Sequence, residues 1–262
     1  MNLIKRYHKY KKVSQFYSQH KIFKKTFRTD TLVLTVAFNK PNLIKQQYKL
    51  LKKYVQDDFE YVVIDNSTVS DASNTIQIFC KKNKIVYYRL LNNPAPEHPS
   101  QSHGYALNWS VKNLLNNKVK NLAYLDHDIF PYKKYSFSSA IAKQPFYGVR
   151  QTKNKAWYLW PGFCIFNLDK VEIKKINFLP MPGLDTGGSM WPDIYKKHNL
   201  RKLKFAKVEN NFIGKGKNKQ KNGYQIVDNA WVHLINGSNW AKVGNMSEKE
   251  KILKNINSLN KN

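Results

Sequence analysis

The sequence predicts an α/β protein built on a mostly parallel, Rossmann-like central sheet flanked by helices. Short apolar runs rich in β-branched and aromatic residues alternate with stretches of helical period, as in chains that wind back and forth over one parallel sheet. The chain has 262 residues, which is enough for one sizeable domain with a core. Its hydrophobic content of 42% and aromatic content of 14% are those of a folded protein.

The alternation of expected strands and helices can be followed as far as Pro131. The expected strands are the apolar runs 31–38, 61–64, 85–90 and 119–125. The expected helices are 43–54, 75–82 and 105–115, in which apolar residues recur every three or four positions. Because crossovers between parallel strands are right-handed in nearly all proteins, these strands are expected to form one sheet with the helices on its faces. Pro131 is expected to turn the chain out of that sheet.

Beyond Pro131 the pattern is less regular and predicts a smaller, mixed region. Short strands are expected at 146–149 and 163–166, and the lysine- and glycine-rich stretch 214–223 is expected to be a mobile loop. Residues 246–262 are expected to form a C-terminal helical tail, opened by a capping box of Ser247 and Glu250. The predicted organisation is one domain over 30–245 between two terminal segments.

Residues 1–29 form a basic, aromatic N-terminal segment without any acidic residue. Their apolar positions recur at spacings of three and four, so an amphipathic helix with a lysine face is expected. Such a helix fits either against the domain or on an anionic membrane surface. We favour the domain, because aromatic stripes at helical spacing more often belong to a core.

The chain carries 45 basic and 17 acidic residues, a formal net charge of +28. Such a field attracts nucleic acid, anionic membranes and polyanionic substrates. The excess is nearly all lysine, is spread along the whole chain and accompanies abundant Asn, Ile and Tyr, so an AT-rich coding sequence explains it equally well. No apolar run is long enough to span a membrane and no signal-peptide core precedes the domain. A cytoplasmic protein is therefore expected, with peripheral membrane contact through residues 1–29 as the alternative.

The most informative motif is Asp126-His127-Asp128, which directly follows an apolar run. In an open α/β sheet ligands bind at the carboxyl ends of the strands, where this motif is expected to lie. Two hard carboxylate ligands there suit Mg²⁺ or Mn²⁺ carrying a diphosphate. The alternative is a turn with two solvated aspartates, since so short a pattern often arises by chance. His127 points the opposite way in an extended segment and is not expected to be a ligand.

Several segments, in this order, resemble nucleotide-sugar-dependent glycosyltransferases of the GT-A fold over residues 31–240. They are Val36–Asn39, Ile64–Ser67, His103–Asn108 and the Asp-x-Asp motif. A late segment, His233–Trp240, is similar to the histidine-containing segment near the end of several such enzymes. The resemblance implies a nucleotide-binding half at 30–131 and an acceptor half at 132–245.

For the base and ribose of the donor, the resemblance implies contacts at the ends of the first two strands. Asp65 is expected to accept hydrogen bonds from the base or ribose. Ala37, Phe38 and Asn39 are expected to form the floor under the base. The alternative for Asp65 is an Asx-turn that closes its strand through the residues that follow.

For the diphosphate and sugar, the resemblance implies contacts from 103–108. His103 and Gly104 are expected in a tight loop at a helix N-terminus, where Gly104 lets the donor approach the backbone and the helix dipole favours the diphosphate. Asn108 is expected to contact the donor sugar or to hold the Asp-x-Asp loop. A plain capped helix explains His103 and Asn108 equally well.

The resemblance also implies a metal shell of Asp126, Asp128 and His233 for Mn²⁺ or Mg²⁺. Asp128 is the expected direct ligand, while Asp126 is shared between metal, water and donor sugar, so that it also counts among the donor-binding residues. His233 would complete the shell through its imidazole. The alternative for His233 is a hydrogen-bonded structural residue within a strand.

For the catalytic base, the best candidate is Asp185, in a loop rich in glycine, with Asp193 second. The chain lacks the paired acids that mark the base in common inverting families, so the base and the stereochemistry stay open. A turn or N-cap aspartate is the alternative for Asp185. Trp160, Gly162 and Trp191 are candidates for contact with an acceptor sugar, against the alternative that the tryptophans belong to the core.

The expected function is metal-dependent transfer of a hexosyl or related sugar from a UDP- or GDP-linked donor to a glycan, glycolipid or glycoprotein acceptor. The alternative is a basic nucleic-acid-binding protein, or a metal-dependent nuclease using Asp65, Asp126 and Asp128. No recognisable nucleic-acid motif is present and the basic residues are not focused on one element, so no specific nucleic acid is expected as a partner. A third reading is a non-catalytic carbohydrate- or membrane-binding module.

Overall fold

The computed structural model describes residues 27–91, 93, 95–115, 118–153, 155–212 and 223–237. The predicted N-terminal helix, nearly all of the predicted loop 214–223, Trp240 and the predicted tail 246–262 lie outside the described residues. Among the helices of the described part, none has the length and apolar character needed to cross a membrane.

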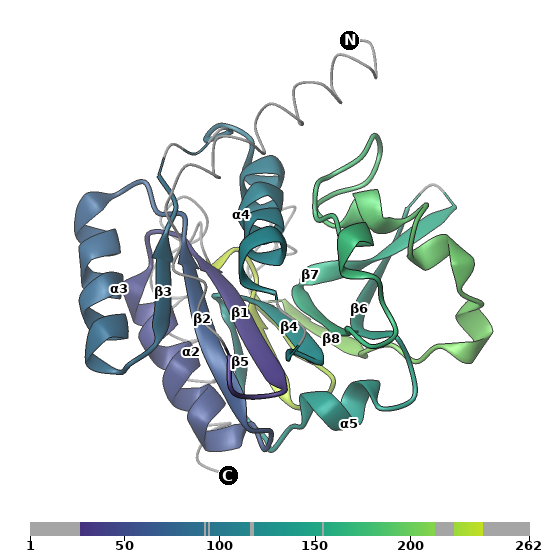
Figure 1. The fold of residues 1–262 in the computed structure, drawn as a ribbon, viewed down its shortest axis with the longest axis horizontal. Coiled ribbons are helices and arrows are strands. Elements are labelled where there is room, and N and C mark those ends of the chain that lie inside the picture. The colour runs from purple at the N-terminus through teal and green to yellow at the C-terminus, as the bar shows by residue number, and fades with distance from the viewer. Residues whose placement is uncertain are drawn as a thin grey trace.

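A six-stranded mixed sheet forms the centre of the molecule, in the order β3-β2-β1-β4-β7-β6 (Figure 1). Its strands are β1 Thr31–Ala37, β2 Phe59–Asp65, β3 Val86–Arg89, β4 Asn121–Asp126, β6 Phe146–Lys153 and β7 Ala156–Asn167. The strands β3, β2, β1 and β4 run parallel, whereas β7 runs antiparallel to both β4 and β6. Every residue of β1 is buried, as expected for a central parallel strand covered on both faces.

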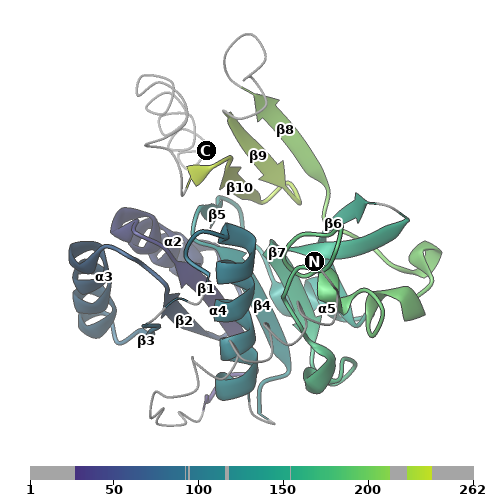
Figure 2. The same cartoon turned by 90° about the horizontal axis from the view of Figure 1, so that it is seen from above.

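Helices cover both faces of the central sheet (Figure 2). They are α2 Pro41–Tyr54, α3 Ser70–Lys82, α4 Pro99–Leu114 and α5 Phe137–Ile141. On one face, Val33 and Val63 of the sheet share a core with apolar residues of α2, α3 and α5. On the other face, Leu34 and Ile64 pack with α4 and with the irregular chain after β7. Because alternate residues of a strand point to opposite faces, one continuous apolar run serves both cores.

A smaller antiparallel sheet lies beside the central one, in the order β5-β10-β9-β8 (Figure 2). Its strands are β5 Ile129–Pro131, β8 Val208–Phe212, β9 Gly223–Val227 and β10 Trp231–Leu234. Between β7 and β8 the chain forms short 3-10 turns at Ile173–Lys175, Gly188–Met190, Tyr195–Lys197 and Leu200–Lys202. The ring of Trp231 is fully buried and packs edge-on against Phe163 of the central sheet, which joins the two sheets through one core.

The predicted class of fold, a mostly parallel sheet flanked by helices with a smaller region beside it, is confirmed. As predicted, the chain has left the central sheet by Pro131, which ends β5 of the small sheet. The two sheets, however, do not divide at that residue, since β6 and β7 complete the central sheet. The strand predicted at 163–166 is one part of β7, which runs for 12 residues.

Helix α4 begins at Pro99, several residues before the predicted start at 105. Pro99 occupies a first-turn position, where the missing N–H costs nothing and the fixed φ suits a helix. The polar residues that follow gave no apolar period from which this turn could be predicted. His103 and Gly104 therefore lie within a helix and not in the predicted loop.

Candidate active site

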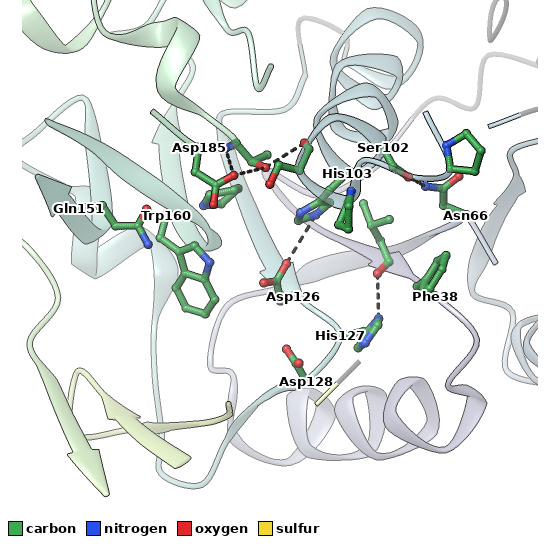
Figure 3. A pocket seen from close by; sticks show the side chains of 16 residues that line it. Phe38, Asn66, Ser102, His103, Asp126, His127, Asp128, Gln151, Trp160 and Asp185 are labelled. Atoms are coloured by element: carbon green, nitrogen blue, oxygen red, sulfur yellow. Dashed lines mark hydrogen bonds and ion pairs between the residues drawn. The ribbon is translucent and has the colours of Figure 1, made fainter. Parts of the chain in front are cut away.

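A cavity of ≈ 290 Å³ opens at the carboxyl ends of β1 and β4, where the Asp-x-Asp motif lies (Figure 3). The chain leaves β1 into α2 on one face of the sheet, whereas α4, which leads into β4, lies on the other face. In open α/β sheets, ligands bind at the point where the helical connections of neighbouring strands lie on opposite faces of the sheet. The lining includes Val36, Phe38, Asn66, Pro96, Pro99, Ser100, Ser102, His103, Asp126, His127, Asp128, Gln151, Trp160, Pro161, Asp185 and Thr186.

Asp128 and His233 form a close pair at the edge of this cavity. Asp128 Oδ1 lies 3.5 Å from His233 Nε2, and the side chains are 8% and 13% exposed. The pair is held by the small sheet, in which Leu234 N donates to Asp128 O at 2.9 Å. Burial raises the pKa of the Asp128 carboxyl, but the neighbouring imidazoles of His233 and His127 outweigh it, so that the pKa lies below its ordinary value. Asp128 is thus held as an anion.

His233 is oriented from two directions. Its Nδ1 lies 2.7 Å from Gln225 Oε1, and its ring packs against the ring of Trp160 at 4.6 Å, centroid to centroid, with the two planes tilted by 55°. Since a carbonyl oxygen only accepts, the Gln225 contact places a proton on Nδ1, and Nε2 is the ring nitrogen that faces Asp128.

Asp126 forms a second acid–imidazole pair, with His103 of α4. Asp126 Oδ1 lies 3.5 Å from His103 Nε2, and the two side chains are about one-quarter exposed. Burial raises the pKa of the Asp126 carboxyl above its usual value; the charge of Asp128 adds to this effect, and His103 opposes it. The two aspartates are therefore electrostatically different, although they are two residues apart in the chain.

The predicted metal shell is brought together only in part. Asp128 and His233 are adjacent, whereas Asp126 is paired with His103. In the part of the chain that the structure describes, no group of three or more His, Cys, Asp or Glu side chains is arranged to hold a metal ion. Any ion here would need ligands from a bound molecule in addition to the protein.

His127 lies between the two aspartates in the sequence but is held differently. It is 5% exposed, and its Nδ1 lies 3.1 Å from the carbonyl oxygen of Val36 in β1. Its Nε2 has no hydrogen-bond partner in the described chain. The ring thus connects the turn after β4 to the end of β1 and borders the cavity.

Two glycines leave room for the two carboxylates. A Cβ on Gly162 would lie 2.5 Å from Asp126 Oδ2 and would strike the ring of Trp160. A Cβ on Gly237 would lie 2.6 Å from Asp128 Oδ2. Both positions require glycine because any side chain would displace an acidic group of the cavity. This is the observed role of Gly162, which does not itself line the cavity.

Asp65 does not have the predicted donor-binding position. It is fully buried and does not line the cavity. Its oxygens accept hydrogen bonds from Ser73 Oγ at 2.5 Å, from Tyr87 Oη at 2.7 Å and from the backbone N–H of Ser67 at 2.9 Å, and Arg89 pairs with it at 3.2 Å. The Asx-turn alternative is the observed one. The nuclease set of Asp65, Asp126 and Asp128 is therefore not brought together.

The adjacent residue, Asn66, has the position that was predicted for Asp65. Asn66 lines the cavity, is 3% exposed and donates from Nδ2 to Ser102 Oγ at 2.8 Å, while its Oδ1 has no partner in the described chain. The sequence did not indicate Asn66, because the acidic residue at the strand end, Asp65, was the more obvious candidate. The residue after Asp65 is the one that leaves the strand toward the cavity. The only sequence signal for Asn66 was its position directly after the expected strand 61–64 and Asp65.

Of the three residues predicted to form the floor under the base, only Phe38 lines the cavity. Ala37 is fully buried in the core under α2 and α3. Asn39, with a φ of 53°, accepts at Oδ1 from the backbone N–H groups of Thr68 and Val69. It joins the loops after β1 and β2 and does not contact the cavity.

Of the three donor-binding residues predicted within 103–108, only one lines the cavity. His103 lines the cavity, but Gly104 packs against the chain after β7, where a Cβ would lie 2.7 Å from Phe178 O. Asn108 accepts from Phe178 N at 2.7 Å and donates to Asn177 Oδ1 at 2.8 Å. Gly104 and Asn108 thus fix the irregular segment on α4 and do not border the cavity.

Asp185 lies where the cavity meets a second groove. It borders both, and the second groove, of ≈ 460 Å³, is further lined by Lys153 of β6 and by 180–184. Asp185 Oδ1 accepts from Thr186 N at 2.7 Å, and its other oxygen is in no hydrogen bond that the structure shows. Asp193 is exposed and borders neither space.

Of the two tryptophans predicted to contact an acceptor, one lines the cavity and the other packs in the core. Trp160 lines the cavity next to His233. Trp191 instead packs against the core, with its ring 5.9 Å from that of Trp157, and borders neither space. The alternative of a core tryptophan therefore holds for Trp191.

The charge of the cavity is opposite to that of the chain. Its lining has three aspartates and no lysine or arginine among the described residues, although the chain as a whole has a net charge of +28. Within the described residues, the lysine excess is therefore not directed into this site.

The fold and the site together define an α/β protein with an acidic ligand cavity at the carboxyl edge of its sheet. No protein-family model matches the chain, and no curated protein matches it.

Solved structures of glycosyltransferases are similar to it. A mannosyltransferase from Pyrobaculum calidifontis, in complex with GDP-Man and Mn²⁺, aligns with a TM-score of 0.40 and 12% identity over 61% of this chain and 51% of its own. S. aureus TarS 1–349 in complex with UDP aligns with a TM-score of 0.39 and 19% identity over 57% of this chain and 50% of its own. The mannosyltransferase Ktr4p from S. cerevisiae aligns with a TM-score of 0.38 and 10% identity over 64% and 67%.

The chain thus spans about half the length of the first two of these proteins. Because the identities and TM-scores are this low, the activity of this chain has to be argued from the residues of its own cavity.

Proposed function

We propose that this chain is a metal-dependent glycosyltransferase. It would transfer one sugar from a UDP- or GDP-linked donor to a hydroxyl group of a glycan, glycolipid or glycoprotein. The proposal combines the sequence resemblance with the acidic cavity at the carboxyl edge of the central sheet.

The observation that carries the proposal is the charge of the cavity. Asp126, Asp128 and Asp185 line it, and no lysine or arginine of the described chain does. A diphosphate placed directly beside these carboxylates would be repelled. A divalent cation between the carboxylates and the diphosphate would remove this repulsion. Such cations prefer oxygen ligands, which the carboxylates and the diphosphate would both supply.

The donor set suits Mn²⁺ or Mg²⁺. Asp128 would supply a carboxylate oxygen, and the Nε2 lone pair of His233 faces the same point. Carboxylate and imidazole are both ligands of Mn²⁺, and the diphosphate would supply the remaining oxygens. When bound, the ion neutralises the charge that develops on the departing diphosphate. Asp126 is placed to accept hydrogen bonds from sugar or ribose hydroxyls beside it.

The two ends of the cavity suit the two ends of a nucleotide sugar (Figure 3). Phe38 and Asn66 lie at one end, where an aromatic ring and an amide side chain would border a nucleobase. Trp160 and Asp185 lie at the other, where the sugar would meet its acceptor. The two aspartates of the motif lie between, in the place of the diphosphate.

In an inverting reaction, Asp185 would act as the general base. The acceptor hydroxyl oxygen would attack the anomeric carbon of the donor sugar while the bond from that carbon to the diphosphate oxygen breaks. The hydroxyl proton would pass to the carboxylate of Asp185, which borders both the cavity and the neighbouring groove. That groove, of ≈ 460 Å³, is where an acceptor would lie.

Calorimetric titration with UDP and with GDP tests the proposal. We expect one of them to bind in the presence of Mn²⁺, to lose binding when EDTA is added, and to lose it in Asp128→Ala. Asp58→Ala, which removes an exposed carboxylate outside the cavity, is the matched control. Binding that ignores both Mn²⁺ and Asp128 contradicts the metal site, and no binding of either nucleotide contradicts the donor site. Release of the nucleoside diphosphate from a panel of nucleotide sugars then identifies the donor.

A further inference from the structure

A row of three polar residues crosses the small sheet and ends at the candidate metal site. Asn210 of β8 lies directly opposite Gln225 of β9, and Gln225 lies directly opposite His233 of β10. Directly opposite residues of antiparallel strands have their side chains on one face of the sheet, within contact distance. The register of the sheet therefore brings these side chains into line.

The hydrogen bonds along the row have a direction. Gln225 Nε2 donates to Asn210 Oδ1 at 2.7 Å, which leaves Gln225 Oε1 to accept from His233 Nδ1, also at 2.7 Å. In the neutral imidazole, a proton on Nδ1 leaves a lone pair on Nε2, which is the form that binds a metal ion. Asn210 thus fixes the amide of Gln225, and Gln225 fixes the tautomer of His233.

The second ring nitrogen of His233, Nε2, lies beside an acidic side chain. His233 Nε2 faces Asp128 Oδ1 at 3.5 Å, and the ring of Trp160 packs against the imidazole at a tilt. When the ring is neutral, a divalent cation between the Nε2 lone pair and the carboxylate oxygen would be bound by both. Metal-binding histidines commonly donate their other N–H to an oxygen acceptor, which orients the ring and increases its basicity.

We propose that Gln225 is a positioning residue that prepares His233 to bind a divalent metal ion. The inference rests on the proposed function, since it assigns a role within the same metal site. Gln225 does not line the cavity and would act only through His233. The small antiparallel sheet then has a specific task, which is to hold the imidazole in one tautomer beside Asp128.

Mn²⁺ binding to the full-length protein tests the role of Gln225. The free ion is measured by its electron paramagnetic resonance signal during titration, first with Mn²⁺ alone and then with UDP present. Gln225→Met keeps the length of the side chain but cannot accept a hydrogen bond, so Mn²⁺ affinity should fall roughly 10- to 100-fold. Gln225→Glu can only accept, so affinity should stay within about threefold of the wild type or increase. Gln56→Met, at an exposed glutamine outside the cavity, should leave the affinity unchanged.

A double-mutant cycle separates positioning from a general effect on the sheet. In a His233→Ala background, Gln225→Met should have no further effect on Mn²⁺ affinity, because the residue through which it acts is absent. An additional loss in that background would overturn the inference, as would wild-type affinity in Gln225→Met. If Gln225→Met does not fold, the Glu variant still decides, since a large loss of affinity there contradicts an acceptor role. If Mn²⁺ binding to the wild type does not require Asp128, the proposed metal site itself fails.

Discussion

His233 Nε2 lies 3.5 Å from Asp128 Oδ1, although the two residues belong to segments far apart in the sequence. The antiparallel pairing of β10 with β5 brings them together, with His233 directly opposite Ile129. The small sheet is thus part of the candidate site, because it places the imidazole of His233 beside the second aspartate of the Asp-x-Asp motif.

Gly237 gives the first prediction, because its Cα lies against this pair. A Cβ there would lie 2.6 Å from Asp128 Oδ2 and would push the carboxylate from its place. We expect Gly237→Ala to weaken Mn²⁺-dependent nucleotide binding at least ~10-fold, equivalent to ~1.4 kcal/mol, by calorimetry. Lys207→Ala, at an exposed position just before β8, should leave binding intact. Unchanged affinity in Gly237→Ala would mean that Asp128 does not contact the ion.

Substitution of Asp185 should lower sugar transfer without weakening nucleotide binding. We expect Asp185→Asn to lower the transfer rate by about 10²- to 10⁴-fold, the usual contribution of a general base, while the affinity for the nucleotide stays near that of the wild type. The measurement is release of nucleoside diphosphate with and without acceptor. Asp193→Asn is the matched control, because its carboxylate is exposed and borders neither space. An equal loss in both variants, or none in Asp185→Asn, would remove Asp185 as the base.

Asp65 should act on stability and not on ligand binding. Asp65→Ala leaves Arg89 without its partner and removes the acceptor for Ser73 and Tyr87. Loss of one partner from a buried pair costs about 3–5 kcal/mol, so we expect a loss of that order in the free energy of unfolding, measured in urea. Asp71→Ala, at an exposed position in the first turn of α3, should cost less than about 1 kcal/mol.

The folded fraction of Asp65→Ala should bind nucleotide as the wild type does, because Asp65 does not line the cavity. Wild-type stability combined with a large loss of nucleotide affinity would contradict this, and would restore the donor-binding role that the sequence suggested.

Asn66 should affect the nucleotide but not the ion. Loss of one hydrogen bond in a buried site costs about 1–1.5 kcal/mol, so Asn66→Ala should weaken nucleotide binding by about tenfold. Mn²⁺ binding in the absence of nucleotide should be unaffected, because Asn66 lies at the other end of the cavity from Trp160, whose ring contacts His233 (Figure 3). Asn39→Ala is a useful comparison, because it removes an amide that joins two loops and should change stability instead. A change in Mn²⁺ affinity in Asn66→Ala would contradict this assignment.

The sequence alone determined the strands of the parallel sheet and the place of the Asp-x-Asp motif. Both follow from local patterns: β1 is an uninterrupted apolar run, and Asp126 comes where the run of β4 ends. Since parallel strands end at one edge of a sheet, the motif had to lie at the ligand edge.

Only the tertiary structure decided which polar residues face the cavity. Asp65 and Asn66 are adjacent at the end of β2, yet Asp65 is neutralised by Arg89 and the hydroxyls around it, while Asn66 borders the cavity. Gln225 could not be singled out from the sequence either, since its contact with His233 depends on the register between β9 and β10. Local periodicity determines where a strand ends, whereas the partner of each side chain is set by long-range pairing, which a one-residue slip would change completely.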